Sequence, residues 1–339
     1  MHEYEINILD LYIKIVDEWK FPDTDFEIIK SDWNSINEKI KQGKAHEISE
    51  GDTFYLGAST KGAKGGSQRS QPFNKIQAKQ RAYSFKQGYL NHIIATLNKD
   101  SQINYGKIIS SKNEIKNRTI QEIVLDRFKP YINKTINDII GDLNYNLNKN
   151  AKGFYTSLTK LMLGISLDKE IEEFDKAGIK LKTIRLKSNN LPKEDISFPT
   201  FSFLEIVDEE WENSFFKEIL ETKYLFVFYK YDENNELKLN KVKFWNMPQK
   251  DIIEAKKVWN KVKKIVANGD IVREVKGKIR YTNFPNKDFN KIAHVRPHAL
   301  NASDTLPLPF RDRVTKKMEY TKQSFWLNNS YVRDTIYPN

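Results

Sequence analysis

Two stretches of the chain share the apolar periodicity of an amphipathic helix. In the first, large apolar residues recur at intervals of three to four positions around a central tryptophan, and in the second the intervals around the tryptophan are less regular. This spacing places them on one face of an α-helix. The first set is Phe26, Ile29, Trp33, Ile36 and Ile40, and the second is Ile252, Val258, Trp259, Val262 and Val266. We expect both tryptophans to lie in the core.

The two predicted helices belong to a longer internal repeat. Gly43 and Gly269 stand where a left-handed C-terminal cap is expected, and strands are predicted at 51–56 and 277–281. An aromatic tail follows in each copy, at residues 83–89 and 325–331. At one constant offset, Asp25, Trp33, Gly43 and Gly51 match Asp251, Trp259, Gly269 and Gly277. An ordered match of helix, strand and tail indicates a duplicated unit.

The segment between the two copies is predicted to be an α/β domain. Residues 224–229 are continuously apolar, which is typical of a sheet centre buried on both faces. Thr119 and Glu122 form a capping-box pattern at the start of a helix. Further helices are predicted at 134–148 and 153–164, and strands at 179–186, 199–206, 224–231 and 241–245. Helices flanking a mixed sheet define the expected fold class.

The polar composition of residues 95–118 predicts a linker with little core. We therefore divide the chain into residues 1–94, the C-terminal part of a first unit, the linker 95–118, and residues 119–339, a complete second unit. Only a β-like run at 6–13 precedes the first copy. We expect that copy to lack the α/β segment that precedes the second.

Composition narrows the class of partner. The 339 residues suffice for about two domains. Lys and Arg number 56 against 45 Asp and Glu, and the net charge of +11 suits a polyanionic partner. The absence of cysteine excludes disulfides, zinc–cysteine sites and a thiol nucleophile. We find no signal peptide and no apolar run long enough for a membrane span, so a cytoplasmic protein without membrane partners is expected.

Residues 173–183 resemble the metal-binding strand of a nuclease whose acids have been replaced. In such enzymes an acid, a short spacer and Glu-x-Lys place two carboxylates and a lysine at one sheet edge, where Mg²⁺ binds. Here the Glu-x-Lys positions read Lys180-Leu181-Lys182. Two ammonium groups do not hold a divalent cation. The alternative is an ordinary surface strand with solvated lysines.

Several motifs together resemble the MutH/Sau3AI family. The motifs are residues 152–155, 163–165 and 178–184, Trp211-Glu212, the Trp259 helix, and residues 294–299 and 322–327. The family comprises mismatch-repair nicking enzymes and type II restriction endonucleases that act at GATC. The Sau3AI type, with two MutH-like units in one chain, is the most similar. The resemblance implies a restriction-endonuclease-like mixed sheet flanked by helices.

The resemblance also implies a degenerate catalytic site. The positions of the family's catalytic residues correspond to Lys160, Glu173, Lys180, Lys182 and Lys223. Two of the three acids have become lysine, so the second unit is expected to be pseudo-catalytic, with no metal. The intact enzyme would use Mg²⁺ bound to acids in a missing N-terminal catalytic region. The rival interpretation is an active enzyme in which Glu172, Glu173 and Asp175 rebuild the metal site.

The family's DNA-contacting positions are better preserved. Its recognition loop corresponds to Arg296-Pro297-His298, and to Ser59-Thr60-Lys61 in the first copy. An arginine or lysine there can contact guanine O6 and N7. The basic glycine-rich loop with Lys61, Lys64 and Arg69 is expected to contact phosphates. The second recognition segment contributes Lys86, Asn328 and Asn329. Pro297 argues against a metal pair of His294 and His298.

We therefore interpret the chain as the DNA-binding, GATC-recognising effector portion of a restriction endonuclease. Such an enzyme is a hydrolase that belongs to a restriction-modification system. We expect that this portion does not cleave DNA by itself. Its partner would be double-stranded GATC DNA, and assembly into oligomers on DNA is left open. Two alternatives remain. One is an active Mg-dependent endonuclease that cuts at GATC. The other is a basic nucleic-acid-binding scaffold, for DNA or RNA, without site specificity.

Overall fold

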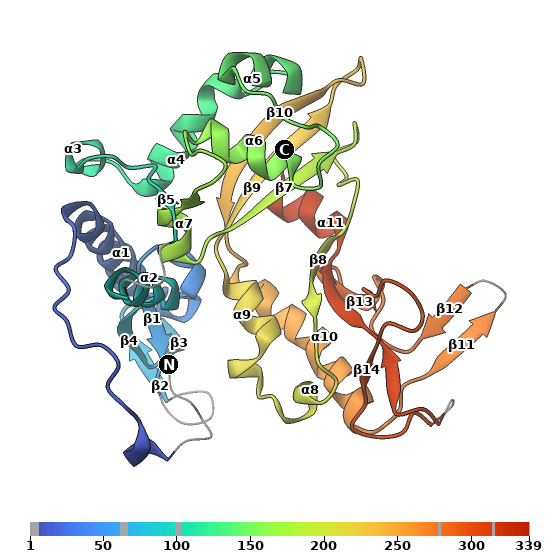
Figure 1. Cartoon of the computed structure of the whole chain (residues 1–339). Helices are drawn as coiled ribbons and strands as arrows, with labels where there is room; N and C mark the ends of the chain where they lie inside the picture. Colours follow the sequence, from blue (N-terminus) through green and yellow to red (C-terminus); the bar gives the residue numbers. More distant parts are fainter. Residues whose placement is uncertain (1–6, 62–66, 99–102, 277–278, 314–315, 339) are drawn as a thin grey trace.

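Strand β9 (Tyr224–Tyr231) forms the centre of a three-stranded sheet in the computed structural model, which describes residues 7–61, 67–98, 103–276, 279–313 and 316–338. Strand β10 (Leu237–Trp245) pairs with it antiparallel, and β7 (Lys180–Leu186) pairs parallel on the other side (Figure 1). Alternate residues of β9 enter two apolar clusters. The cluster that contains Leu225, Val227 and Tyr229 is called the upper core, and the cluster that contains Tyr224, Phe226 and Phe228 is called the lower core. The prediction of a sheet centre buried on both faces is confirmed.

Helices cover both faces of this sheet. On the upper core lie α4 (Ile120–Phe128), α5 (Ile136–Leu143) and α6 (Phe154–Met162), and on the lower core α8 (Glu205–Asp208), α9 (Phe215–Glu221) and α10 (Gln249–Ala267). The capping box predicted for Thr119 and Glu122 is present at the start of α4. A helix that buries one apolar face needs such a layer to pack against. The expected mixed α/β class is confirmed.

A second three-stranded sheet lies beside the lower core. Its antiparallel order is β13 (Ala293–Pro297), β16 (Gln323–Leu327) and β8 (Ile196–Thr200). The short helix α11 (Asn329–Tyr331) and a π-helix at Val332–Ile336 follow β16. Two hairpins extend from this part of the chain (Figure 1): β11 (Arg273–Lys276) with β12 (Ile279–Thr282), and β14 (Thr305–Pro307) with β15 (Glu319–Thr321).

The first ninety residues contain the long helix α1 (Asp23–Lys41). Strands β1 (Leu56–Thr60) and β4 (Arg81–Phe85) pair, β2 (Gln68–Gln71) and β3 (Asn74–Lys79) form a hairpin, and α2 (Gln87–Leu97) follows. Two strand predictions are wrong here. The described part of 6–13 contains a 3-10 helix at Ile8–Asp10, and residues 51–56 begin with a 3-10 turn.

The internal repeat has a structural counterpart. Helices α1 and α10 are both 19 residues long, and both begin after a proline. Gly43 and Gly269 follow them with φ of +70° and +63°, the left-handed conformation predicted for the caps. The Tyr89 hydroxyl donates to Asp25 at 3.0 Å, and the Tyr331 hydroxyl donates to Asp251 at 2.7 Å. The division of the chain into units remains a prediction.

Strand register aligns the two recognition segments. Ser59 pairs with Ala82, and Arg296 pairs with Ser324, which puts Ser59 and Arg296 at equivalent positions. The counterpart of β1 is therefore β13, and the predicted match to a strand at 277–281 is wrong. That segment overlaps the β11–β12 hairpin, and Gly277 lies outside the described residues.

The prediction that both tryptophans are core is half right. Trp259 is 3% exposed, whereas Trp33 is 48% exposed. Helix α1 buries a different stripe, which contains Asp25 and Asp32. The Asp32 carboxylate accepts the backbone N–H groups of residues 54–56, at 2.6–2.9 Å. These hydrogen bonds hold Asp32 inward, and the buried stripe combines Asp25 and Asp32 with Ile28 and Ile36.

The predicted linker is part of the core. Strand β5 (Tyr105–Gly106) pairs parallel with β6 (Glu170–Ile171), and α3 (Lys112–Ile115) follows. Ile108, Ile109 and Ile115 are buried in the upper core together with residues of α1 and α2. The expectation of little core is therefore wrong for this stretch, because its mostly polar composition includes three isoleucines that are buried.

Candidate functional site

Lys180 and Lys182 lie on one face of β7. Successive side chains of a strand alternate between faces, and Ile184 and Leu186 continue the same row into the lower core. Lys182 has a lowered pKa because its side chain is largely buried and because the charge of Lys180 lies nearby. Within the described part of the chain, neither ammonium forms an ion pair. The structure thus joins these two predicted site residues.

Lys223 does not join them. Its ammonium lies 4.3 Å from the centre of the Phe54 ring and donates to the Asp52 carbonyl at 3.2 Å. Phe54 belongs to the upper core, whereas the row of Lys182 leads into the lower core. The prediction that Lys223 completes the degenerate site is therefore not supported by the geometry.

Lys160 and Glu173 have local partners of their own. The Lys160 ammonium donates to the Lys169 carbonyl at 2.8 Å and to Glu170 at 3.0 Å. The Glu173 carboxylate accepts the N–H groups of Ile108 and Ile109 at 2.9 Å. Burial raises the pKa of Glu173, and these two hydrogen bonds oppose the rise. The Glu173 carboxylate therefore holds the backbone of residues 108–109 in place.

The acids that could rebuild a metal site point to different partners. They lie on or beside α7 (Glu172–Ala177). Glu172 accepts from Lys176 at 2.6 Å, and Asp175 accepts from the Tyr105 hydroxyl. Among the described residues, no group of three or more His, Cys, Asp or Glu is arranged to hold a metal ion. The side chains at the predicted metal positions do not supply the oxygen ligands that Mg²⁺ needs.

A groove of about 170 Å³ opens beside Lys182, between β7 and the start of β8. Arg185 and Lys193 also line it, together with Glu194 and Asp195. Arg185 is paired with Glu194 at 2.6 Å. The cations of this groove are the kind of side chain that contacts phosphate.

Arg296 is exposed at the end of β13, as a DNA-contacting residue must be. Its guanidinium carbon lies 4.3 Å from the centre of the Trp326 ring, and Nη1 donates to Asp195 at 3.0 Å. The His298 ring lies 5.2 Å from the same indole and its Nδ1 is 2.9 Å from the Ser324 hydroxyl. The side chains of Arg296 and His298 therefore both contact the Trp326 ring.

The other predicted contacts are placed less favourably. Asn328 is 2% exposed and bonds to His294 and to the Asn290 carbonyl, so it positions β13 and the chain just before it. Asn329 is half-buried at the start of α11. The Lys86 ammonium points inward to the Thr53 carbonyl, and burial lowers its pKa to about 8. The geometry of Asn328 and Lys86 therefore supports structural roles.

In the first copy, Lys61 and Arg69 are exposed beside the glycine-rich loop. Lys64 lies outside the described residues. Sequence reasoning missed Asp195 and Lys287, which form an ion pair at 2.9 Å. No spacing in the chain marks them, because Asp195 and its partner Arg296 stand 101 positions apart.

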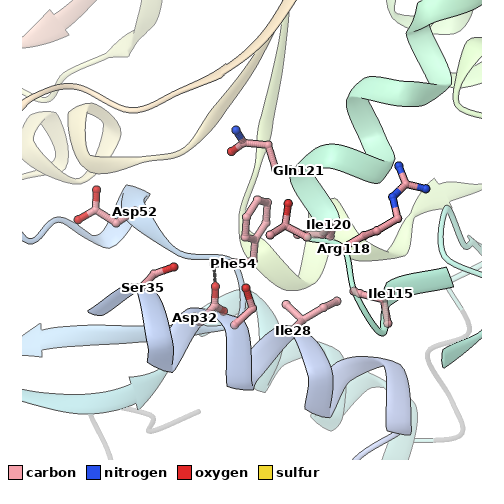
Figure 2. A pocket seen from close by; sticks show the side chains of 11 residues that line it. Ile28, Asp32, Ser35, Asp52, Phe54, Ile115, Arg118, Ile120 and Gln121 are labelled. Atoms are coloured by element: carbon pink, nitrogen blue, oxygen red, sulfur yellow. Dashed lines mark hydrogen bonds between the residues drawn. The ribbon is translucent and has the colours of Figure 1, made fainter. Parts of the chain in front are cut away.

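A second cavity, of about 190 Å³, lies between α1 and the start of α4 (Figure 2). Its lining joins Asp32, Asp52 and Phe54 to Ile115 and Arg118. Asp32 is occupied by backbone N–H groups, and Asp52 is paired with Lys39 at 2.8 Å. The cavity lies at the contact between the first ninety residues and the rest of the chain. The carboxylates of Asp32 and Asp52 in its lining are already hydrogen-bonded or paired.

Comparison with known proteins places this geometry in a family. Residues 163–256 match the family described as the DNA mismatch repair enzyme MutH. The type II restriction enzyme Sau3AI of Staphylococcus aureus is 36% identical over 348 residues, which cover 92% of this chain and 70% of the relative. The chain belongs to the family of this restriction enzyme.

Family membership bears on the earlier expectations. The region matching MutH contains β7 and the predicted site positions Glu173, Lys180, Lys182 and Lys223, whereas Lys160 lies just before it. The expected loss of an N-terminal catalytic region gains no support from a match that covers 92% of the chain. In the described part of the chain, no helix is long and apolar enough to cross a membrane. The roles of individual residues stay predictions.

Proposed function

We propose that this chain binds duplex DNA at GATC as a Sau3AI-like restriction enzyme and that Arg296 reads a guanine. The observation that carries the proposal is the exposed guanidinium of Arg296, stacked on Trp326 beside His298. Guanine presents O6 and N7 in the major groove, and arginine is the side chain that most often contacts both. Membership in the family of a restriction enzyme and the net charge of +11 support DNA as the partner.

We propose further that the β7 site binds DNA without cleaving it. Lysines occupy two of the three acid positions, and the remaining acid, Glu173, is bonded to backbone N–H groups. A divalent cation needs several oxygen ligands, which this set does not supply. The cations around Lys182 can instead contact phosphate directly. In this proposal the chain needs no metal to bind DNA.

A second candidate is Mg-dependent cleavage at GATC. The comparison favours it over the non-cleaving proposal, because the relative is named as a restriction enzyme and aligns with 92% of this chain. Cleavage would require metal ligands other than the residues at the family positions on β7. The chemistry that Mg²⁺ supplies in such enzymes is polarisation of the phosphate and activation of water.

A plasmid assay separates the two candidates. Purified protein is incubated with GATC-containing plasmid in Mg²⁺, with controls in chelator and on a plasmid without GATC. The non-cleaving proposal predicts a shift in mobility without nicks. Site-specific cleavage that needs Mg²⁺ decides for the second candidate. If cleavage survives Lys182→Met, the site responsible lies away from β7.

A further inference from the structure

Asp195 lies almost buried among cations that face solvent. Its side chain is 8% exposed, whereas those of Lys287 and Arg296 are 43% and 48% exposed. Lys287 donates to the carboxylate at 2.9 Å, and Arg296 Nη1 donates at 3.0 Å. Asp195 immediately precedes β8, so a rigid strand fixes the position of its carboxylate. The Asp195 carboxylate thus restrains the guanidinium of Arg296, the residue predicted to contact guanine.

The guanidinium of Arg296 is restrained on two sides. Trp326 lies under its face at 4.3 Å, and Asp195 holds Nη1 at one edge. Arginine carries five N–H donors in one plane. The contact with Asp195 uses a donor on Nη1, which leaves those of Nη2 and Nε for other acceptors. The restrained group is therefore still able to bind two acceptors on a base edge.

We infer that Asp195 is a specificity-determining positioning residue, which acts through Arg296 by holding the guanidinium ready for guanine. This inference rests on the proposed function of Arg296. A mobile arginine loses side-chain freedom when it binds a base, and prior restraint removes much of that cost. The gain applies only where the base offers both acceptors, so it increases the affinity for the correct sequence.

The charge of Asp195 acts in the same direction. Without it, Lys287 and Arg296 would attract phosphates of any sequence, because phosphate contacts carry no sequence information. The carboxylate partly neutralises both cations and lowers this nonspecific attraction. Replacement of Asp195 therefore affects the two kinds of DNA oppositely. A carboxylate that only held β8 in place would affect them equally.

The rival interpretation is an ion pair with no role in recognition. Many surface ion pairs contribute nothing measurable. Asp142 provides a matched comparison, because it lies on α5 away from the groove, pairs with Lys134 at 2.7 Å and has a side chain that is 42% exposed. Asp142→Asn removes the same formal charge as Asp195→Asn and leaves Arg296 and the groove unchanged.

The experiment measures the dissociation constants for a GATC duplex and a scrambled duplex at one salt concentration. In Asp195→Asn the preference for GATC is expected to fall at least about threefold, against roughly 5- to 150-fold for loss of a complete bidentate contact. Affinity for scrambled DNA is expected to stay or rise. Asp142→Asn is expected to keep the wild-type preference. An equal loss on both duplexes overturns the inference.

Arg296→Lys provides a second route, because it alters an exposed side chain and keeps the charge while removing the planar fork. In the Arg296→Lys background, Asp195→Asn is expected to leave the preference unchanged, since the two residues act as one unit. A further fall in that background contradicts action through Arg296. If the wild type itself shows no preference for GATC, the proposed function fails. If the wild type prefers GATC and Asp195→Asn keeps that preference, only the inference on Asp195 fails.

Discussion

Lys86 and Lys223 place two ammonium groups inside the protein. Lys86 donates to the Thr53 carbonyl, and Lys223 donates to the Asp52 carbonyl above the Phe54 ring. Burial lowers the pKa of each lysine to about 8. For Lys223 the charge of Lys86 lowers the pKa further. At neutral pH both groups are therefore charged in surroundings that disfavour charge.

This arrangement predicts that stability rises with pH. An unfolded lysine titrates near about 10.4. Between about pH 8 and 10, the unfolded chain binds more protons than the folded one, so the free energy of unfolding increases with pH. Urea denaturation at several pH values measures it. Lys223→Met is expected to flatten the rise, because it removes one of the two groups.

Lys41→Met serves as the control, since the Lys41 side chain is 71% exposed. It is expected to keep the wild-type rise with pH. Buried tyrosines such as Tyr224, whose pKa is raised well above its usual value by burial, act in the opposite direction only at higher pH. An unchanged slope in Lys223→Met would refute this account of the buried lysines.

Residue pairing shows the limit of sequence reasoning at this scale. Arg296 was predicted from a local motif, and the structure leaves it exposed. Its partner Asp195, and Lys287 on the same carboxylate, come from other parts of the chain, and only the folded structure brings the three together. Lys86 was predicted to face DNA, but its inward hydrogen bond depends on residue 53 and could not be read from composition.

At the scale of elements, α1 and α10 share one sequence pattern but pack differently. Both have the same length and the same proline and glycine boundaries. Trp259 packs against Trp211 at 5.5 Å between ring centres, and its Nε1 donates to Glu209 at 3.1 Å. The equivalent Trp33 is 48% exposed. Equal sequence positions therefore carry unequal shares of the packing energy.

The two tryptophans give a matched prediction about stability. Trp259→Ala leaves a cavity in the lower core and is expected to cost about 3–5 kcal/mol of unfolding free energy. Trp33→Ala is expected to cost less than about 1 kcal/mol, because its side chain is half exposed. Chemical denaturation of both variants measures the difference. Equal costs would show that α1 is packed differently from this description.

Elements with strong local signals were predictable. The apolar run of β9, the capping box of α4 and the glycine caps of α1 and α10 are set by nearby residues, and each was found as predicted. The strand expected at 199–206 instead ends at Thr200, and α8 begins at Glu205. The orientation of α1 was missed because it involves hydrogen bonds from residues 54–56 to Asp32, which the apolar periodicity of the helix does not reveal.

At the scale of the whole molecule, the first ninety residues and the rest share one core. Tyr55 and Tyr89 lie in the upper core with Ile108 and Ile109. Lys176 of α7 binds Asp25 of α1 at 2.8 Å, with both side chains at most 5% exposed. Breaking such a buried pair is expensive, because an unpaired charge would remain. The first ninety residues are therefore coupled to the rest of the chain by packing and by charge.

The net charge of +11 adds a sequence-independent attraction for DNA. Such attraction weakens as salt displaces the counterions that phosphate contacts release. Affinity for a single duplex therefore does not distinguish a site-specific protein from a basic scaffold. The distinction requires two sequences at the same salt concentration.

The most direct test of the account is a titration of the wild type and of Arg296→Ala with a GATC duplex and a scrambled duplex of equal length. The wild type is expected to prefer GATC. Arg296→Ala is expected to lose most of that preference, about 1–3 kcal/mol for a bidentate guanine contact, while it keeps weak binding to both. Equal affinity of the wild type for both duplexes would contradict sequence recognition by this chain.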